Sequence, residues 1–143
     1  MRSSEPVFVD SVHLIGLFLV GDQWHQAAEA AEASLASRRR ITSHGVFQEF
    51  LAHVSRFGEG ARSLAMASIR SLQQDKSVSV VTHTEELVRA ALNLYAGEFL
   101  YTRLSLQDCI AIQIMRDFGI GEILTADQEF ALAGMTPLLR RYI

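Results

Sequence analysis

Two carboxylates stand where strands of the chain are predicted to end, and these residues are well placed to do chemistry. Asp10 follows the apolar run Val7–Val9, a pattern typical of a short buried strand. Asp127 comes two residues after another predicted strand, Glu122–Thr125. If the sheet is parallel, both lie at its carboxyl edge, where ligands bind in open α/β sheets. Asp10 has an alternative role as the N-cap of the predicted helix Ser11–Val20, because aspartate is a favoured cap.

Two further carboxylates belong to predicted helices. Asp108 lies in the first turn of its helix, within an apolar arc formed by Ala111, Ile112 and Met115. An isolated buried carboxylate costs several kcal/mol, of which a helix N-terminus recovers only about 0.3–1 kcal/mol. Two alternatives therefore stay open for Asp108: a cation binds it, or it accepts a hydrogen bond from a loop N–H. Glu49 borders the apolar stripe of another predicted helix and poses the same question.

The four carboxylates form an oxygen-only site if the fold brings them together. Clustered carboxylates repel one another and cannot all stay ionised without a cation. No set of Cys or His residues stands at metal-ligand spacing, so the donors favour Mg²⁺ or Mn²⁺ over zinc. Such an ion polarises a phosphoryl group and activates water. The pattern therefore indicates hydrolysis of a phosphodiester.

The sequence excludes several other classes of protein, because the residues or motifs that they require are missing. A phosphatase with an Asp-x-Asp nucleophile pair needs an acid at position 12, which is Val12. A receiver domain needs adjacent acids at the end of the first strand, where Ser11 follows Asp10. The chain has no G-x-x-x-x-G-K-[ST] phosphate loop and no G-x-S-x-G nucleophile elbow.

The composition is that of an ordered globular protein. The chain has 143 residues, of which 49% are apolar and 20% charged, and its net charge is −3. That charge argues against a protein that coats nucleic acid through bulk positive charge. The single Cys109 excludes an internal disulfide and a multi-cysteine zinc site. The apolar run Val12–Val20 falls short of the roughly 18 residues of a membrane span. We expect a soluble, cytoplasmic protein with a single domain over residues 1–143.

Apolar periodicity divides the chain into alternating strands and helices, which implies a parallel sheet covered on both faces. We expect an α/β fold of three layers, α/β/α, with a central, mostly parallel, five-stranded sheet. The predicted strands are Val7–Val9, Arg40–Thr42, Ser77–Val81, Glu122–Thr125 and Met135–Leu139. The predicted helices are Ser11–Val20, Gln23–Ser37, residues 44–56, Ala61–Gln74, residues 85–95, residues 106–118 and Asp127–Ala133.

Local motifs predict how some helices begin and which way they face. Thr82 and Glu85 form a capping-box pattern, and Ser105 is the predicted N-cap of a later helix. The basic run Arg38–Arg40 is interpreted as a solvated loop, and the five histidines as packing or capping residues. In the helix Ala61–Gln74 the predicted inward residues are Leu64, Ala67, Ile69 and Leu72.

Together these segments resemble the PIN-domain ribonucleases, most closely the VapC-like toxins of bacterial toxin–antitoxin pairs. The resemblance runs from Val7 to about Leu139, and it rests on the order and spacing of the segments. The matching segments are Val-Phe-Val-Asp10-Ser11, Asp22 to Ala28, Thr42 through Glu49-Phe50-Leu51, Leu104-Ser105-Leu106-Gln107-Asp108-Cys109, and Leu124-Thr125-Ala126-Asp127-Gln-Glu-Phe130.

The resemblance implies a metal-dependent endoribonuclease that hydrolyses single-stranded or looped RNA. It implies that one or two Mg²⁺ or Mn²⁺ ions are held by four carboxylates, and that two hydroxyl side chains orient these acids or a ligand water. The carboxylates are Asp10, Glu49, Asp108 and Asp127, and the hydroxyls are those of Ser11 and Thr125. It also implies a homodimer, and a cognate antitoxin protein that covers the acidic pocket.

Three positions depart from the family's pattern. Val12 stands where a polar residue is usual, and Thr102 and Arg103 stand where an extra acid is frequent. Arg103 would be able to hold phosphate or an acidic partner instead. These departures keep a second hypothesis open: a non-catalytic PIN-fold protein that binds RNA or a protein partner. In a third, a receiver-like or purely structural α/β domain, the four acids are unrelated.

Overall fold

The computed structural model describes residues 5–141 and contains a five-stranded sheet in the order β3-β2-β1-β4-β5, with every neighbouring pair parallel. The predicted α/β class and five-stranded sheet are therefore confirmed, and the described sheet is parallel throughout. The first four and last two residues of the predicted domain 1–143 lie outside the described residues. The strands are β1 (Val7–Val9), β2 (Arg40–Ser43), β3 (Val78–Val81), β4 (Glu122–Leu124) and β5 (Thr136–Pro137).

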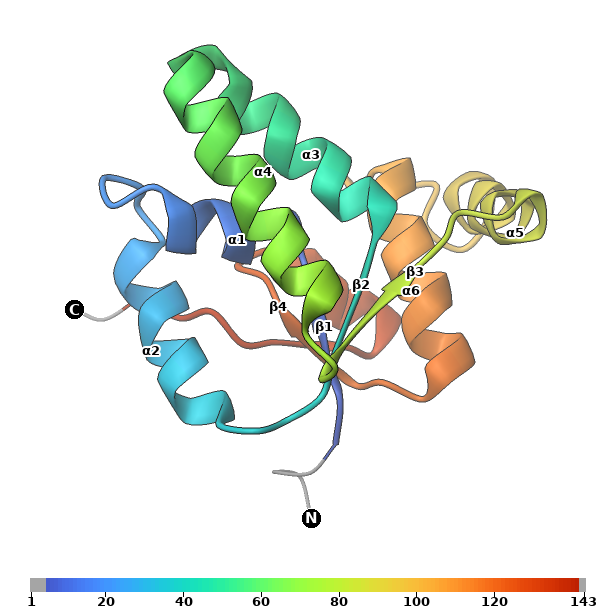
Figure 1. Cartoon of the computed structure of the whole chain (residues 1–143). Coiled ribbons are helices and arrows are strands. Elements are labelled where there is room, and N and C mark those ends of the chain that lie inside the picture. The colour runs from blue at the N-terminus through green and yellow to red at the C-terminus, as the bar shows by residue number, and fades with distance from the viewer. Residues whose placement is uncertain (1–4, 142–143) are drawn as a thin grey trace.

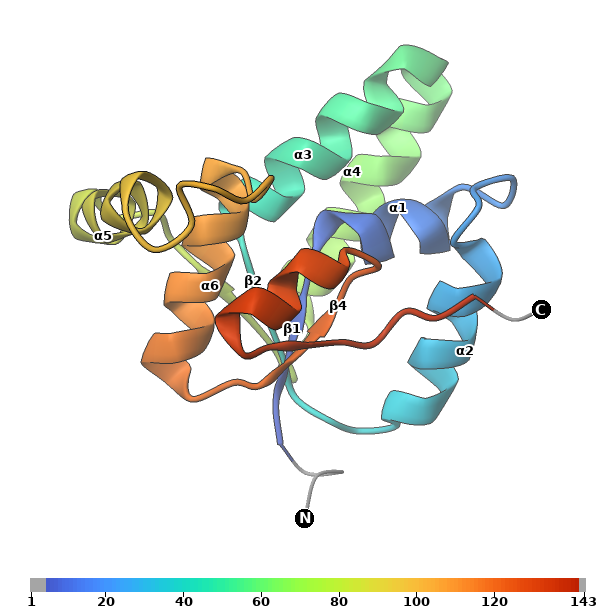
Figure 2. The same cartoon turned by 180° about the vertical axis from the view of Figure 1, so that it is seen from behind.

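Helices cover the sheet on both sides, which gives the predicted three layers. Figures 1 and 2 show α1 and α2 on one side of the sheet and α5 and α6 on the other, while α3 and α4 form a hairpin that extends beyond the end of the sheet. The α-helices are α1 (Ser11–Phe18), α2 (His25–Leu35), α3 (His44–Val54), α4 (Glu59–Gln74), α5 (Glu85–Ala96) and α6 (Leu106–Phe118). Two short 3-10 helices are η2 (Ser55–Phe57) and η3 (Gln128–Ala133).

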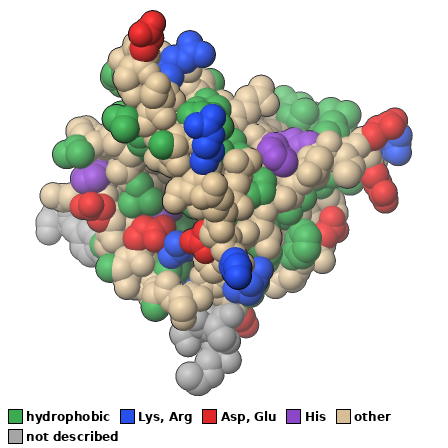
Figure 3. All heavy atoms as spheres, in the orientation of Figure 1, with side chains coloured by type: hydrophobic (Ala, Val, Ile, Leu, Met, Phe, Trp, Pro, Cys, Tyr) green, Lys and Arg blue, Asp and Glu red, His purple; other side chains and the backbone are tan. Residues whose placement is uncertain are grey.

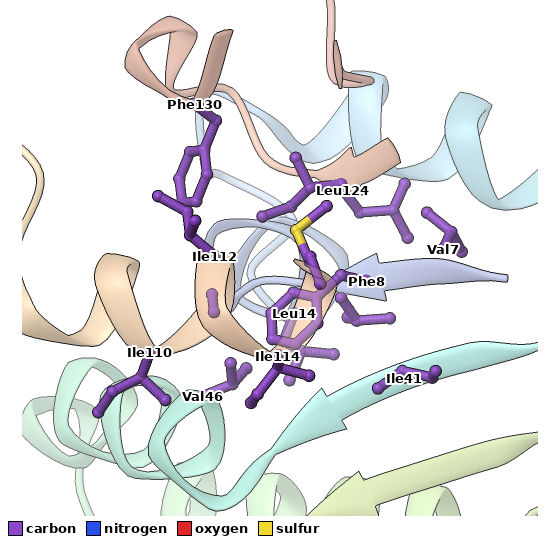
Figure 4. Close-up of a cluster of buried hydrophobic side chains, with 14 of the residues drawn as sticks. Val7, Phe8, Leu14, Ile41, Val46, Ile110, Ile112, Ile114, Leu124 and Phe130 are labelled. Atoms are coloured by element: carbon purple, nitrogen blue, oxygen red, sulfur yellow. The ribbon is translucent and has the colours of Figure 1, made fainter. Parts of the chain in front are cut away.

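The central strand β1 consists of three apolar residues, Val7, Phe8 and Val9, which suits a buried position in the sheet. All three of its side chains are at most 3% exposed, because β1 lies between β2 and β4 and is covered on both faces. Figure 4 shows Phe8 of β1 and Leu124 of β4 in one cluster with Ile112 and Ile114 of α6 and with Phe130. This cluster fixes the carboxyl ends of β1 and β4 side by side, and the carboxylates follow directly from those ends.

Of the N-caps predicted for α5 and α6, one is confirmed and the other is wrong. Ser105 caps α6 as predicted, and its side chain accepts a hydrogen bond from the N–H of Asp108. The predicted cap Thr82 is wrong: Thr84 is the N-cap of α5, and its hydroxyl accepts from the N–H of Leu87 at 3.1 Å. The T-x-x-E pattern fits Thr82, whereas Leu87 stands three residues after Thr84, so the motif pointed to the wrong threonine.

The inner face of α4 differs from the prediction. Ala65 and Ile69 are buried, whereas Leu64 is 65% exposed and Ala67 is also exposed. Because α4 belongs to the projecting hairpin, it meets the core along a narrower stripe than a helix that lies flat on the sheet. No helix within residues 5–141 is both long and apolar enough to cross a membrane.

The run Arg38–Arg40 is not a solvated loop. Arg38 forms an ion pair with Glu122 of β4 at 2.7 Å, and Arg40 forms one with Glu32 of α2 at 2.9 Å. Each of these arginine side chains is at most 16% exposed. The run therefore joins β2 to its neighbours, and only Arg39 is exposed.

Candidate active site

Asp10 stands at the carboxyl edge of the sheet, as predicted. Val9 pairs in register with Leu124, so Asp10 and Thr125 leave adjacent strands at the same level. Asp10 is 5% exposed, caps α1, and accepts a hydrogen bond from the N–H of Ser11 at 2.9 Å. The capping alternative for Asp10 is therefore correct, and its position beside other acids leaves the ligand alternative intact.

The electrostatics of Asp10 are those of a crowded, buried acid. Burial is the main reason that its pKa is raised from 3.8 to about 7. The hydroxyl of Thr125 and the backbone N–H of Ser11 oppose this rise, whereas the charges of Asp108 and Glu49 add to it. Asp10 therefore lies close enough to Asp108 and Glu49 to sense their charges.

Glu49 comes from α3, at the border of the apolar stripe where the sequence placed it. Its Oε1 accepts a hydrogen bond from the hydroxyl of Ser11 at 2.9 Å, which ties α3 to α1. Burial raises the pKa of Glu49, the Ser11 hydroxyl lowers it, and the charge of Asp108 raises it again. Ser11 is itself buried, and the bond is partly buried.

Asp108 occupies the first turn of α6 and satisfies the hydrogen-bonding alternative. Its Oδ2 accepts from the N–H of Ser105 at 2.8 Å, and the hydroxyl of Ser105 accepts from the N–H of Asp108 at 3.1 Å, which completes a capping box. The pKa of Asp108 is nevertheless raised, first by burial and then by the charges of Asp127 and Glu129, against the lowering effect of Ser105. One bond to a loop N–H does not offset this crowding.

Asp127 completes the set, and beside it lies an acid that the sequence analysis missed. Asp127 caps η3 through a hydrogen bond from the N–H of Glu129 to its Oδ1 at 2.9 Å. The carboxylate of Glu129 accepts from the N–H of Arg103 at 3.0 and 3.1 Å. Because the charge of Glu129 raises the pKa of Asp108, a fifth acid stands near the site. Its signal in the sequence is an acid two positions after Asp127.

The hydroxyl residues Ser11 and Thr125 both contact carboxylate residues of the site. Ser11 bonds Glu49, and Thr125, which is completely buried, stands beside Asp10 and accepts a hydrogen bond from the N–H of Asp127 at 3.3 Å. Thr125 therefore contacts two of the four carboxylate residues.

The set of donors fits a hard divalent cation in composition and charge, but the side chains do not form a closed cage. Three of the acids have raised pKa values, which is the condition that a cation relieves. In the part of the chain that the structure describes, no three His, Cys, Asp or Glu side chains are arranged to hold a metal ion. Mg²⁺ usually keeps several waters and takes one or two carboxylates together with substrate phosphate. The arrangement suits that open mode of binding better than a cage made only of protein ligands.

The histidines lie mostly in packing roles, as predicted. His13 is completely buried and its Nε2 lies 2.8 Å from Oε1 of Glu32. His25 bonds the carbonyl of Gly16 through Nδ1 at 2.7 Å, and His83 accepts from the N–H of Gly45 at 3.2 Å. In no case does the structure place these three rings among the four carboxylates.

Known proteins resemble this chain in both sequence and fold. A family model described as "PIN domain" matches residues 7–134. The fold matches the crystal structure of VapC20 from Mycobacterium tuberculosis, described as a toxin that cleaves the sarcin–ricin loop, with a TM-score of 0.81. The two sequences are 27% identical, and the match covers 94% of this chain and 99% of that one. No curated protein sequence gives a significant match.

Proposed function

This chain belongs to the PIN-domain family, and on that premise we propose that it is a metal-dependent endoribonuclease, the toxin of a toxin–antitoxin pair. The observation that carries the proposal is that the acid after β1, the acids of α3 and α6, and the acid after β4 lie close enough to raise one another's pKa values. The likeness to a VapC toxin that cleaves RNA supports the substrate class.

In this proposal Asp10, Glu49, Asp108 and Asp127 hold one or two Mg²⁺ or Mn²⁺ ions. A bound ion would polarise the scissile phosphoryl group and lower the pKa of the attacking water. The chain's own part is to hold the carboxylates in place, because an oxygen of each one accepts a local hydrogen bond. The donors to those bonds are the backbone N–H of Ser11, the hydroxyl of Ser11, and the backbone N–H groups of Ser105 and Glu129.

The test of the ion site is calorimetric titration of Mn²⁺ into the purified protein and into Asp108→Asn. We expect binding in the parent and its loss in the variant. The matched control is Asp117→Asn, which changes the same residue type on the exposed end of the same helix. Equal binding in all three proteins would contradict the proposed ligand set.

The test of the activity is cleavage of structured RNAs by the parent and by Asp10→Asn in Mn²⁺. Asp10→Asn keeps the size of the side chain and an oxygen that can cap α1, so we expect a folded protein without cleavage. Full activity of this variant would contradict the proposed role of Asp10. Circular dichroism at the assay temperature checks that the fold survives.

A second candidate function is a PIN-fold protein that binds RNA or a protein partner without cutting it. Three observations favour it: Val12 adds no polar group beside Asp10, Arg103 replaces a frequent acid, and the described acids form no ready three-ligand cage. Intact RNA binding without Mn²⁺ binding would support this function over the first.

We further infer two protein partners from the family. One is a cognate antitoxin that covers the acidic pocket, and the other is a second copy of the chain in a homodimer. Sedimentation of the purified protein tests the homodimer, and co-expression with the product of any small neighbouring reading frame tests the antitoxin.

A further inference from the structure

An acidic site needs cations nearby if it is to accept RNA. Five carboxylates surround the site, and the whole chain has a net charge of −3. Bound divalent ions would offset only the charge at the scissile phosphate, so the neighbouring phosphates of the strand must find positive groups elsewhere. Many arginines cannot serve, because Arg38, Arg40, Arg89 and Arg116 are each paired with a carboxylate.

One unpaired arginine stands in line with the acids. On α3, His53 follows Glu49 by four residues and Arg56 follows by seven, so the three side chains share one side of the helix as it continues into η2. Within residues 5–141, no carboxylate lies within salt-bridge distance of Arg56. At about 1.5 Å of rise per residue, Arg56 stands roughly 10 Å along the helix from Glu49.

The guanidinium of Arg56 lies against the rings of two neighbouring residues, His53 and Phe57. One of its N–H groups lies 3.3 Å from Nε2 of His53, and its central carbon lies 5.1 Å from the centre of the Phe57 ring. These contacts position the guanidinium group of Arg56, and no described carboxylate pairs with it.

Phe57 gives this cluster an exposed aromatic face. Its side chain is 53% exposed at the end of η2, next to the tip of the hairpin that extends beyond the sheet (Figures 1 and 2). Figure 3 shows charged side chains of both signs near that tip and no continuous basic patch on this face of the molecule. The positive charge beside Phe57 is therefore local, and Glu59 is the one acidic residue in the sequence between Glu49 and Asp75.

An exposed aromatic ring beside an unpaired arginine matches the chemistry of a single nucleic-acid strand. Unstacked bases lie on aromatic faces and guanidinium planes, and the backbone phosphates take the positive charge. A strand that follows α3 outward from the acids would reach Arg56 within a few nucleotides of the scissile bond, because Arg56 stands only roughly 10 Å along the helix from Glu49.

We propose that His53, Arg56 and Phe57 form a strand-binding edge that holds the RNA on one side of the scissile phosphate. Arg56 contacts a backbone phosphate, and Phe57 stacks against an unpaired base. The proposal rests on the proposed ribonuclease function for its substrate, but it concerns binding and positioning rather than the chemical step.

The experiment measures binding of a labelled single-stranded RNA to the Asp10→Asn protein, so that cleavage does not interfere. In that background we expect Arg56→Ala to weaken binding about tenfold at low salt, and to reduce the slope of log K against log salt by about one. Arg56→Lys keeps the charge and should restore most of the slope. Phe57→Ala should weaken binding by a similar factor and leave the slope unchanged.

The matched control is Arg70→Ala, which removes one arginine from the same hairpin but from the face of α4 that lines a separate hollow with Leu51 and Ser55. Its binding should stay within twofold of the parent. Equal losses in Arg56→Ala and Arg70→Ala would reduce the effect to bulk charge and overturn the proposal. Unchanged RNA binding in both Arg56→Ala and Phe57→Ala would also overturn it, and would leave the exposed ring to a protein partner.

Cleavage by the protein with Asp10 intact separates this inference from the proposed function. If the protein cleaves RNA, Arg56→Ala should raise KM and leave kcat unchanged. If the protein does not cleave RNA but binds it through Arg56, the strand-binding edge stands and the ribonuclease proposal fails. If cleavage occurs with an unchanged KM in Arg56→Ala, the strand-binding edge fails and the ribonuclease proposal stands.

Discussion

The hydroxyl of Ser11 donates a hydrogen bond to Oε1 of Glu49 at 2.9 Å, across 38 residues of sequence. The bond joins the first turn of α1 to the middle of α3, and Ser11 is also the residue whose backbone N–H bonds the carboxylate of Asp10. A single small residue therefore positions two of the four candidate ligands.

We predict that Ser11→Ala weakens Mn²⁺ binding and RNA cleavage about 10–100-fold, the range typical of groups that orient metal ligands. The backbone bond to Asp10 survives in this variant, so the loss reports on Glu49 alone. Titration calorimetry and initial rates give the two values. Ser34→Ala is the control, since that hydroxyl is exposed and bonds only the carbonyl of Ala31 in its own helix. An unchanged Mn²⁺ affinity in Ser11→Ala would contradict the prediction.

The raised pKa of Asp10 predicts that stability without metal falls as the pH rises. Below about pH 3.8 the carboxyl is protonated in both folded and unfolded protein. Between pH 3.8 and about 7 the unfolded chain releases the proton while the folded protein keeps it, so the free energy of unfolding declines across this window. Above about pH 7 the full cost of the buried charge is present.

Asp10→Asn removes this dependence. In EDTA we expect its gain in stability over the parent to be about 2–3 kcal/mol larger at pH 8 than at pH 5. Urea unfolding at both pH values measures the difference, and added Mn²⁺ should shrink the gain at pH 8 by stabilising the parent. The same gain at both pH values would show that Asp10 does not titrate as described.

The ion pairs of Glu32 predict a purely structural effect. Its carboxylate, 30% exposed, lies 2.8 Å from the buried Nε2 of His13 and 2.9 Å from Arg40, and so joins α2 to α1 and β2. Glu32→Ala removes the carboxylate that both His13 and Arg40 contact. We therefore expect the free energy of unfolding to fall by about 1–3 kcal/mol. Glu29→Ala, on an exposed i,i+4 pair with His25, should change stability by less than about 0.5 kcal/mol.

The pH dependence of the Glu32 contribution follows from its pKa. Burial raises that pKa, but His13 and Arg40 together lower it further, so the net shift is downward from 4.5. The stabilisation is therefore complete above pH 4.5 and is lost as the pH falls below it. A Glu32→Ala deficit that persisted undiminished at pH 3 would contradict this assignment.

Two glycines of the α3–α4 hairpin predict opposite effects of the same substitution. A Cβ at Gly45 would lie 2.0 Å from Oε1 of Gln107 and 2.3 Å from Cε1 of His83, whereas a Cβ at Gly60 meets no atom within 4 Å. We expect Gly45→Ala to destabilise the protein by about 1–3 kcal/mol through overpacking. Gly60→Ala, in the first turn of α4, should stabilise it by up to about 1 kcal/mol. Thermal unfolding of the two variants gives the comparison, and a stabilising Gly45→Ala would contradict the packing described here.

The sequence by itself determined the order of strands and helices and the family. The spacing of apolar residues along a segment reflects which of its side chains face the core. That spacing predicted the α/β class and the five strands that the structure contains. The cap at Ser105 was also predictable, because its hydrogen bonds span only three residues. The resemblance to PIN-domain proteins is confirmed by the family match over residues 7–134. The metal-binding roles of the four acids stay predictions.

Only the tertiary structure decided which side chains meet. The bond from Ser11 to Glu49, the approach of Glu129 to Arg103 across 26 residues, and the ion pair of Arg38 with Glu122 across 84 residues leave no local pattern in the chain. Leu64 was misplaced for the same reason, since helical periodicity gives the direction of a face but not whether another element covers it. Pairing between distant segments depends on how the strands and helices pack, and that packing is a property of the whole chain rather than of any one segment.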